Sequence, residues 1–158
     1  WNPFDAAKRA EVEATGLLTA MSLWLLLRAQ HADFQNCPPP VLPAQAGIRE
    51  TARYVGDAVL TGDELANCTR HADDVALAGW PMEKRENARG PKFRFFDRAE
   101  PAGIPAGCLR NARLPGLFFA GRCLSADHEA LASVRVMGTC MATGEAAAKM
   151  ALAHSRDA

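Results

Sequence analysis

Residues 117–130 of this 158-residue chain read Leu-Phe-Phe-Ala-Gly-Arg-Cys-Leu-Ser-Ala-Asp-His-Glu-Ala. The first four residues form an apolar run of strand length, and Gly121 and Arg122 follow it directly. Ser125 is then expected to cap a helix that has acidic residues in its first turn. A buried strand that turns at glycine into a helix is typical of a ligand site, because glycine permits close backbone contact and the helix start offers free amides. Glycine also punctuates ordinary turns, so a purely structural turn stays open as the alternative.

A second helix is predicted to follow and to run to about His154. It begins near Gly138, Thr139 and Cys140, and its first two turns are rich in small residues. Small side chains let another backbone or a flat ligand come close. The positive end of the helix dipole could therefore face a developing negative charge, although tight helix packing explains the same composition equally well.

The N-terminal part of the chain is predicted to be helical and then extended. Residues 4–32 read as one long helix, and the proline-rich stretch 37–43 ends it as a stiff connector. Residues 48–60 are predicted to form a strand with Arg49 and Arg53 on one face. The other predicted elements are a short helix that begins at a capping box over 61–64, strands near 75–81 and 92–96, and an extended segment at 103–109.

The composition is that of a globular protein without an excess of either charge. Lysine plus arginine and aspartate plus glutamate both number 18, so we expect no nucleic-acid binding. The apolar run 23–27 is shorter than the roughly 20 residues that cross a bilayer, so no membrane span is expected. Five scattered cysteines without a CxxC pair indicate reduced thiols in a cytoplasmic protein. No metal is expected, because alanine at position 132 breaks the HExxH pattern that His128 and Glu129 begin.

Three segments carry a resemblance to a known family: 47–61, which begins Gly-Ile-Arg-Glu-Thr-Ala-Arg, 75–81, and above all the long segment 117–147. From about residue 47 to 153 the sequence resembles the C-terminal part of FAD-dependent oxidoreductases of the glutathione-reductase superfamily, nearest to those that are fumarate-reductase-flavoprotein-like. The resemblance implies a mixed α/β fold. A substrate-side helix and antiparallel strands would be joined to the closing strand–helix unit of a Rossmann-like domain. It implies FAD as cofactor and hydride transfer between the flavin and a small-molecule substrate.

The resemblance also implies roles at the cofactor. Gly121 and Arg122 would pass close to the ribityl-diphosphate of FAD. The helix that starts near Gly138 would direct its amides at the pyrimidine edge of the flavin and stabilise the reduced anion, which agrees with the dipole argument. The implied cofactor-binding residues are Gly121, Arg122, Ser125, Gly138, Thr139 and Cys140.

Other residues are implied on the substrate side. His128 and Arg135 would lie near the flavin as catalytic candidates for substrate positioning or proton transfer. Arg49 and Arg53 would bind substrate, since the arginine fork suits carboxylates. A structural ion pair with Glu50 or another acid is the alternative for these two arginines.

The family's diphosphate cradle is a strand, a GxGxxG turn and a helix, and this sequence contains no GxGxxG. We therefore interpret 1–115 as a portion of a substrate-side domain and 116–158 as the C-terminal segment of the FAD-binding domain. The Rossmann half is expected upstream of Trp1, in the same chain or in a partner, so the chain alone should be inactive and bind FAD weakly or not at all. The alternative is a non-catalytic truncated chain, or a subunit that completes a partner's site.

Overall fold

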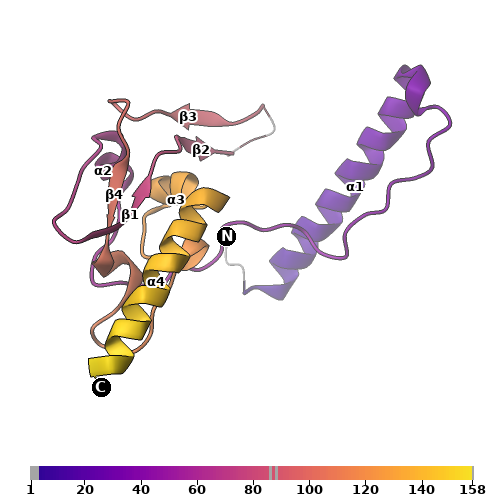
Figure 1. The fold of residues 1–158 in the computed structure, drawn as a ribbon. Coiled ribbons are helices and arrows are strands. Elements are labelled where there is room, and N and C mark those ends of the chain that lie inside the picture. Colours follow the sequence, from indigo (N-terminus) through magenta and orange to yellow (C-terminus); the bar gives the residue numbers. More distant parts are fainter. Residues whose placement is uncertain (1–3, 86, 88, 158) are drawn as a thin grey trace. The chain divides into compact units, whose positions relative to one another are not determined.

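A computed structural model describes residues 4–85, 87 and 89–157 (Figure 1). The chain divides into two compact units, Trp1–Thr51 and Ala52–Ala158. The sequence predicted a Rossmann half upstream of Trp1, and Trp1 itself lies outside the described residues. The assignment of 1–115 and 116–158 to two domains of a larger flavoprotein stays a prediction.

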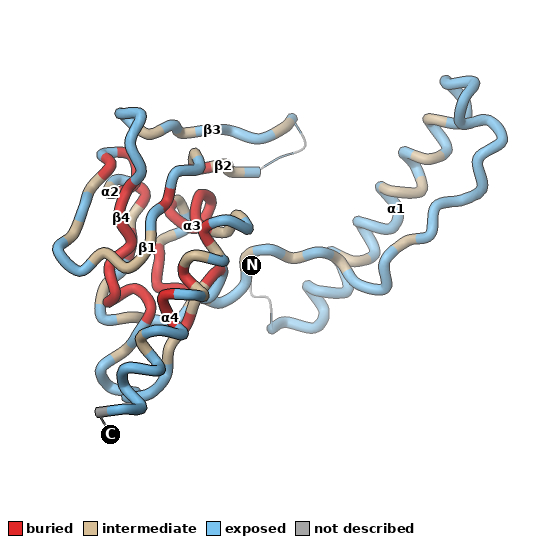
Figure 2. The backbone as a smooth tube through the Cα atoms, viewed as in Figure 1, coloured by how far each residue is buried: buried red, intermediate tan, exposed pale blue. Residues whose placement is uncertain are grey.

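The first unit is built on the helix α1 (Ala6–Gln30), which confirms the long helix predicted over 4–32. Its N-terminus is fixed by Asp5, whose Oδ1 accepts hydrogen bonds from the N–H groups of Ala7 at 3.0 Å and Lys8 at 3.1 Å. A single 3-10 turn, η1 (Ala32–Phe34), follows the helix before the proline-rich connector. None of the residues of α1 is buried, as Figure 2 shows.

The helix α1 is also long and apolar enough, by length and composition, to cross a membrane. The core helix of a soluble protein and a signal sequence near an N-terminus meet the same criterion. The expectation of no membrane span considered only the short run 23–27, and it stays a prediction.

The second unit combines short helices with two antiparallel pairs of strands, which confirms the predicted mixed α/β class. β1 (Asp74–Ala78) pairs with β4 (Ala102–Pro105), and β2 (Met82–Lys84) pairs with β3 (Lys92–Arg94). The helices of this unit are α2 (Gly62–Ala66), α3 (His128–Val134) and α4 (Met137–Asp157), with 3-10 turns η2 (Ala106–Leu109) and η3 (Gly121–Cys123).

The core of this unit surrounds α3. Five of the seven residues of α3 are buried, and Leu131 and Val134 are fully so. Leu65 from α2, Ile104 from β4 and Leu124 complete the packing around them. The buried segments gather in the middle of this unit in Figure 2. Burial of these apolar side chains supplies most of the favourable free energy that holds the unit together.

Two predicted strands do not form. Over residues 48–60 no strand is present, and only Leu60 forms an isolated bridge, to Ala126. The run 117–120 is extended but has a single bridge, between Phe118 and Arg110. An extended segment becomes a strand only when a neighbour completes the ladder of hydrogen bonds, and here the bonds go to turns and loops.

Candidate functional site

The turn η3 lies against the first turns of α4 and is shaped for that contact. Gly121 has a φ of 60°, in the left-handed region that favours glycine. Its buried N–H donates to Oγ1 of Thr143 at 3.1 Å, and that hydroxyl donates to the carbonyl of Thr139 at 2.9 Å. A Cβ at position 121 would lie 3.3 Å from Sγ of Cys140. Position 121 therefore needs glycine for both its conformation and its packing on the helix.

The N-terminal end of α4 is open to solvent. Met137 and Met141 are 83% and 76% exposed, and a Cβ added at Gly138 would meet nothing within 4 Å. The N–H of Cys140 already reaches the carbonyl of Val136 at 2.9 Å. The three N–H groups of residues 137–139 precede that first intrahelical bond and have no acceptor within the helix. This end of α4 combines exposed apolar side chains with the positive end of a helix dipole.

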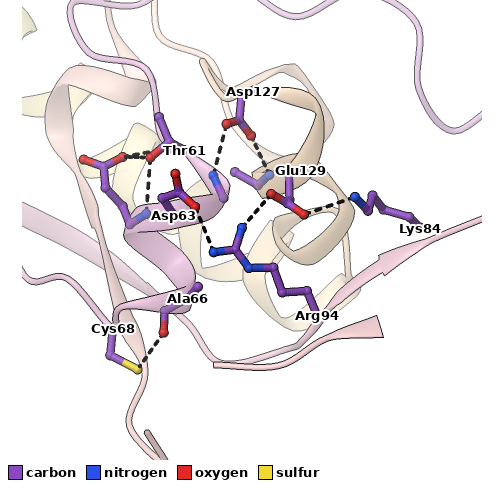
Figure 3. Close-up of polar contacts among 11 residues, drawn as sticks. Thr61, Asp63, Ala66, Cys68, Lys84, Arg94, Asp127 and Glu129 are labelled. Atoms are coloured by element: carbon purple, nitrogen blue, oxygen red, sulfur yellow. Dashed lines mark hydrogen bonds and ion pairs between the residues drawn. The ribbon is translucent and has the colours of Figure 1, made fainter. Parts of the chain in front are cut away.

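Helix α3 is held in place by the carboxylate of Asp127, which bonds to two helices (Figure 3). Oδ1 accepts the N–H of Ala130 at 2.7 Å and so caps α3, and Oδ2 accepts the N–H of Gly62 in α2 at 3.1 Å. Asp127, not Ser125, is the N-cap, so the predicted cap was two residues too early.

Glu129, in the first turn of α3, joins this helix to the hairpin β2–β3 (Figure 3). Its two carboxylate oxygens bind Nζ of Lys84 at 3.1 Å and Nη1 of Arg94 at 2.8 Å. Arg94 also binds Asp63 in α2 at 2.8 Å. The Lys84 hydrogen bond, and then that of Arg94, lower the pKa of Glu129 against the opposing effect of burial. The carboxylate of Glu129 thus connects α3 to β2 and β3, and Arg94 extends the connection to α2.

The structure spreads the other predicted residues of this region over different environments. Ser125 is only 2% exposed, and its backbone bonds to Cys108 and Leu60. His128 is exposed at the first position of α3. The half-buried Arg135 ends that helix and donates from Nη2 to the carbonyl of Glu83 at 3.0 Å. Arg122 is exposed in η3, and Thr139 is buried in the first turn of α4.

The structure does not bring Arg49 and Arg53 together on a strand. Arg49 is exposed in the first unit and Arg53 is half-buried in the second. The strand predicted over 48–60 is absent, so the alternation of side chains along a strand does not place the two guanidinium groups on one face. Their assignment as a substrate-binding pair stays a prediction.

Two cysteine thiols of this unit have perturbed acidity. Burial raises the pKa of Cys108 to about 12, so this thiol is a neutral core group. Burial also raises the pKa of Cys140, while the positive charge of Arg122 opposes the shift and the Cys123 thiol adds to it. The Cys140 thiol therefore shares one electrostatic environment with both of these residues of η3.

Sequence reasoning missed three residues that build the site. Thr143 holds Gly121, Asp127 joins α3 to α2, and Glu129 ties α3 to the hairpin. Thr143 was read only as one of the small residues of the second helix. Its spacing of 22 residues from Gly121 carries no local signal, because it depends on how the turn and the helix pack.

The residues present fit one edge of a flavin rather than the whole cofactor. Gly138 leaves open space at the start of α4, beside exposed apolar side chains and the positive end of the helix dipole. Such a surface suits a planar ring that carries negative charge along one edge. A diphosphate needs a further glycine-rich cradle, which the sequence lacks.

Comparison with known families assigns the chain to one of them. The family model described as FAD dependent oxidoreductase matches residues 1–158. The chain belongs to the FAD-dependent oxidoreductase family, and the family implies FAD as the cofactor. Neither the search of curated proteins nor the search of solved structures finds a match.

Proposed function

We propose that this chain is the C-terminal portion of an enzyme that transfers hydride between a small substrate and FAD. We place it in the glutathione-reductase superfamily, near the fumarate-reductase-like flavoproteins. The observation that carries the proposal is the start of α4, where Gly138 leaves open space and a glycine turn packs on the same helix. The amides of residues 137–139 there have no acceptor within the helix. FAD, when bound, supplies the hydride-carrying chemistry. The protein supplies orientation and charge.

The residues of the site take separate roles in this proposal. The amides of residues 137–139 hold the pyrimidine edge of the flavin, and their dipole favours negative charge there. Arg122 adds a positive charge beside them, close enough to affect Cys140. The bond from Arg135 to the carbonyl of Glu83 fixes its guanidinium near the end of α3. We assign substrate positioning or proton transfer to His128 and Arg135.

We assign the diphosphate to a Rossmann half outside residues 1–158, upstream in the same chain or in a partner. The absence of a GxGxxG turn from this sequence supports this division. Arg49 and Arg53 are proposed to contact an anionic group of the substrate, and the protein is proposed to work in the cytoplasm. The same absence supports the rival proposal, a non-catalytic truncated chain or a subunit that completes a partner's site.

The first test uses the purified chain and FAD. The chain alone should bind FAD weakly or not at all. A stoichiometric absorbance band near about 450 nm, which is typical of a bound flavin, would contradict the proposal that a separate Rossmann half binds the diphosphate. Co-expression with the dinucleotide-binding half should then yield flavin. If it yields none, the non-catalytic alternative is preferred.

The second test places a carboxylate at the start of α4. In the co-expressed protein Gly138→Asp should lower the FAD content at least about tenfold, because a negative charge would face the flavin anion. Ala148→Asp, at an exposed position on the same helix, is the matched control and should leave the FAD content unchanged. An acidic residue in the first turn does not weaken the helix itself, so the variant should fold. Equal flavin content in the two variants would refute the assigned contact.

A further inference from the structure

Two free cysteines, Cys123 and Cys140, lie on the elements η3 and α4, which pack on each other. Cys140 lies in the first turn of the helix, and its sulfur occupies the space directly over Gly121. Cys123 is the last residue of the same turn that Gly121 begins, and it is exposed. The geometry thus gives one accessible thiol and one half-buried thiol on two elements in direct contact.

The turn that carries Cys123 is anchored by its backbone. The N–H of Cys123 donates to the carbonyl of Ala120 at 3.3 Å, and its carbonyl accepts the N–H of Tyr54 at 3.1 Å. Opposite it, Sγ of Cys140 lies 3.7 Å from the carbonyl of Val134. Both cysteines are therefore held by defined backbone contacts on well-formed elements.

A positive charge lies near the Cys140 thiol, whose pKa is raised overall by burial. Arg122 stands between Gly121 and Cys123 in the turn, and its charge lowers the pKa of Cys140 against the effect of burial. Cys123 lies two residues after Gly121, the residue on which the sulfur of Cys140 packs. Reactive cysteines are found in such electropositive and partly exposed surroundings.

The other three cysteines of the chain lack this combination. Cys68 and Cys108 are buried, and Cys37 is exposed but lies in the first unit. They serve as internal controls for the reactivity of the pair.

We propose that Cys123 and Cys140 form a reversible disulfide when the protein meets a hydroperoxide. The Cys123 thiolate attacks the outer oxygen of the hydroperoxide, the O–O bond breaks, and an alcohol (water, from hydrogen peroxide) leaves with a proton. Cys123 is then a sulfenic acid. The sulfur of Cys140 attacks it, the S–S bond forms, and water leaves. The two thiols together lose two electrons and two protons, and the hydroperoxide is reduced.

The disulfide would fix the turn to the helix at the surface that we assign to the flavin. The oxidation state of the pair would therefore report the level of peroxide at this site. The disulfide itself needs no bound cofactor, so it can form whether or not the assigned hydride transfer is right.

The test treats the full 158-residue chain with a small excess of hydrogen peroxide. The expected result is an intact mass lower by about 2 Da, for two hydrogens lost, and a tryptic peptide pair joined through Cys123 and Cys140. A dithiol reductant should restore the original mass. A chain that gives only sulfinic acid at Cys123, or a disulfide through Cys37, would overturn the proposal.

Single variants separate the two steps. Cys140→Ser should stop at the sulfenic acid on Cys123, trapped by dimedone, and Cys123→Ser should give neither product. Cys37→Ser is the matched control and should behave as the unaltered chain. Arg122→Gln should slow disulfide formation severalfold, because the cation no longer opposes the effect of burial on the pKa of Cys140, the thiol that attacks in the second step. Circular dichroism establishes that each variant is folded. A normal sulfenic acid yield in folded Cys123→Ser would also overturn the assignment of the attacking sulfur.

Discussion

Gly121→Ala tests whether the turn η3 is built around a left-handed glycine. With a φ of 60°, alanine at this position costs about 1–2 kcal/mol of conformational energy. Its Cβ would also lie 3.3 Å from Sγ and 3.5 Å from Cβ of Cys140, so the helix must shift by a few tenths of an ångström. Alanine reduces the entropy of the unfolded chain, which returns about 0.4–1 kcal/mol. These two effects leave a loss of up to about 1.6 kcal/mol in the free energy of unfolding, and the close contact with Cys140 adds to it.

Gly138→Ala is the matched control because it makes the same chemical change in α4, 17 residues along the chain. A Cβ there meets nothing within 4 Å, and no positive φ is present. Alanine in a helix is favoured over glycine by up to about 1 kcal/mol, so this variant should be as stable as the unaltered chain or more stable. The two substitutions are thus expected to have opposite signs.

Urea unfolding followed by Trp80 fluorescence measures this difference in the second unit. Trp1→Phe and Trp24→Phe remove the other tryptophans, which belong to the first unit. The midpoint should fall for Gly121→Ala with an unchanged slope against urea. If Gly121→Ala is as stable as Gly138→Ala, position 121 does not carry a strained turn in solution and our account of η3 is wrong.

Three further changes test other parts of the structure. Thr143→Val should lower the free energy of unfolding by about 1–3 kcal/mol, because the buried N–H of Gly121 loses its acceptor, whereas Thr143→Ser should retain most of the stability in the same urea experiment. Glu129→Gln should cost about 1 kcal/mol at neutral pH. Folding lowers the pKa of Glu129, so its contribution to the free energy of unfolding is present above the unfolded pKa of about 4.3 and is lost as the pH falls through the lower folded pKa. The stabilities of Glu129→Gln and the unaltered chain should therefore converge in acid. A difference that stays constant with pH would contradict the ion-pair assignment. Cys108 has a pKa of about 12 and no exposed surface, so it should resist iodoacetamide at mildly alkaline pH until urea unfolds the chain. Rapid labelling of the folded chain would contradict the burial of this thiol in the core.

The helices followed from local sequence rules. The run without proline between Asp5 and the connector predicted α1, and the capping box of Thr61 and Glu64 is present at the start of α2. The periodicity of a helix and the chemistry of its caps lie within a few residues of each other, so they can be read from one sequence. The end of α4 was likewise placed within three residues of Asp157, its last residue.

The missing strands and the anchors of the site depend on packing between distant parts of the chain. The residues alternate over 48–60, but no ladder of hydrogen bonds forms there. The backbone of Tyr54 bonds to Cys123, and that of Leu60 bonds to Ser125 and Asp127. Ser125 looked like a cap because it is a good capping residue, but it is buried in the packed core, and Asp127 holds the position. Spacing in sequence indicates which conformation a segment favours. It does not indicate which neighbour lies beside it.

The carboxylate of Asp127 has a consequence for how homologous sequences should vary. It accepts one N–H from each of two helices, through different oxygens. Asparagine caps a helix as well as aspartate does, but it has only one accepting oxygen, and its amide would face the N–H of Gly62. A Cβ at Gly62 would in turn collide with the side chain of Glu129. In an alignment, Gly62, Asp127 and Glu129 should therefore change together or not at all, which would make the three positions a sequence marker for this arrangement of α2 and α3.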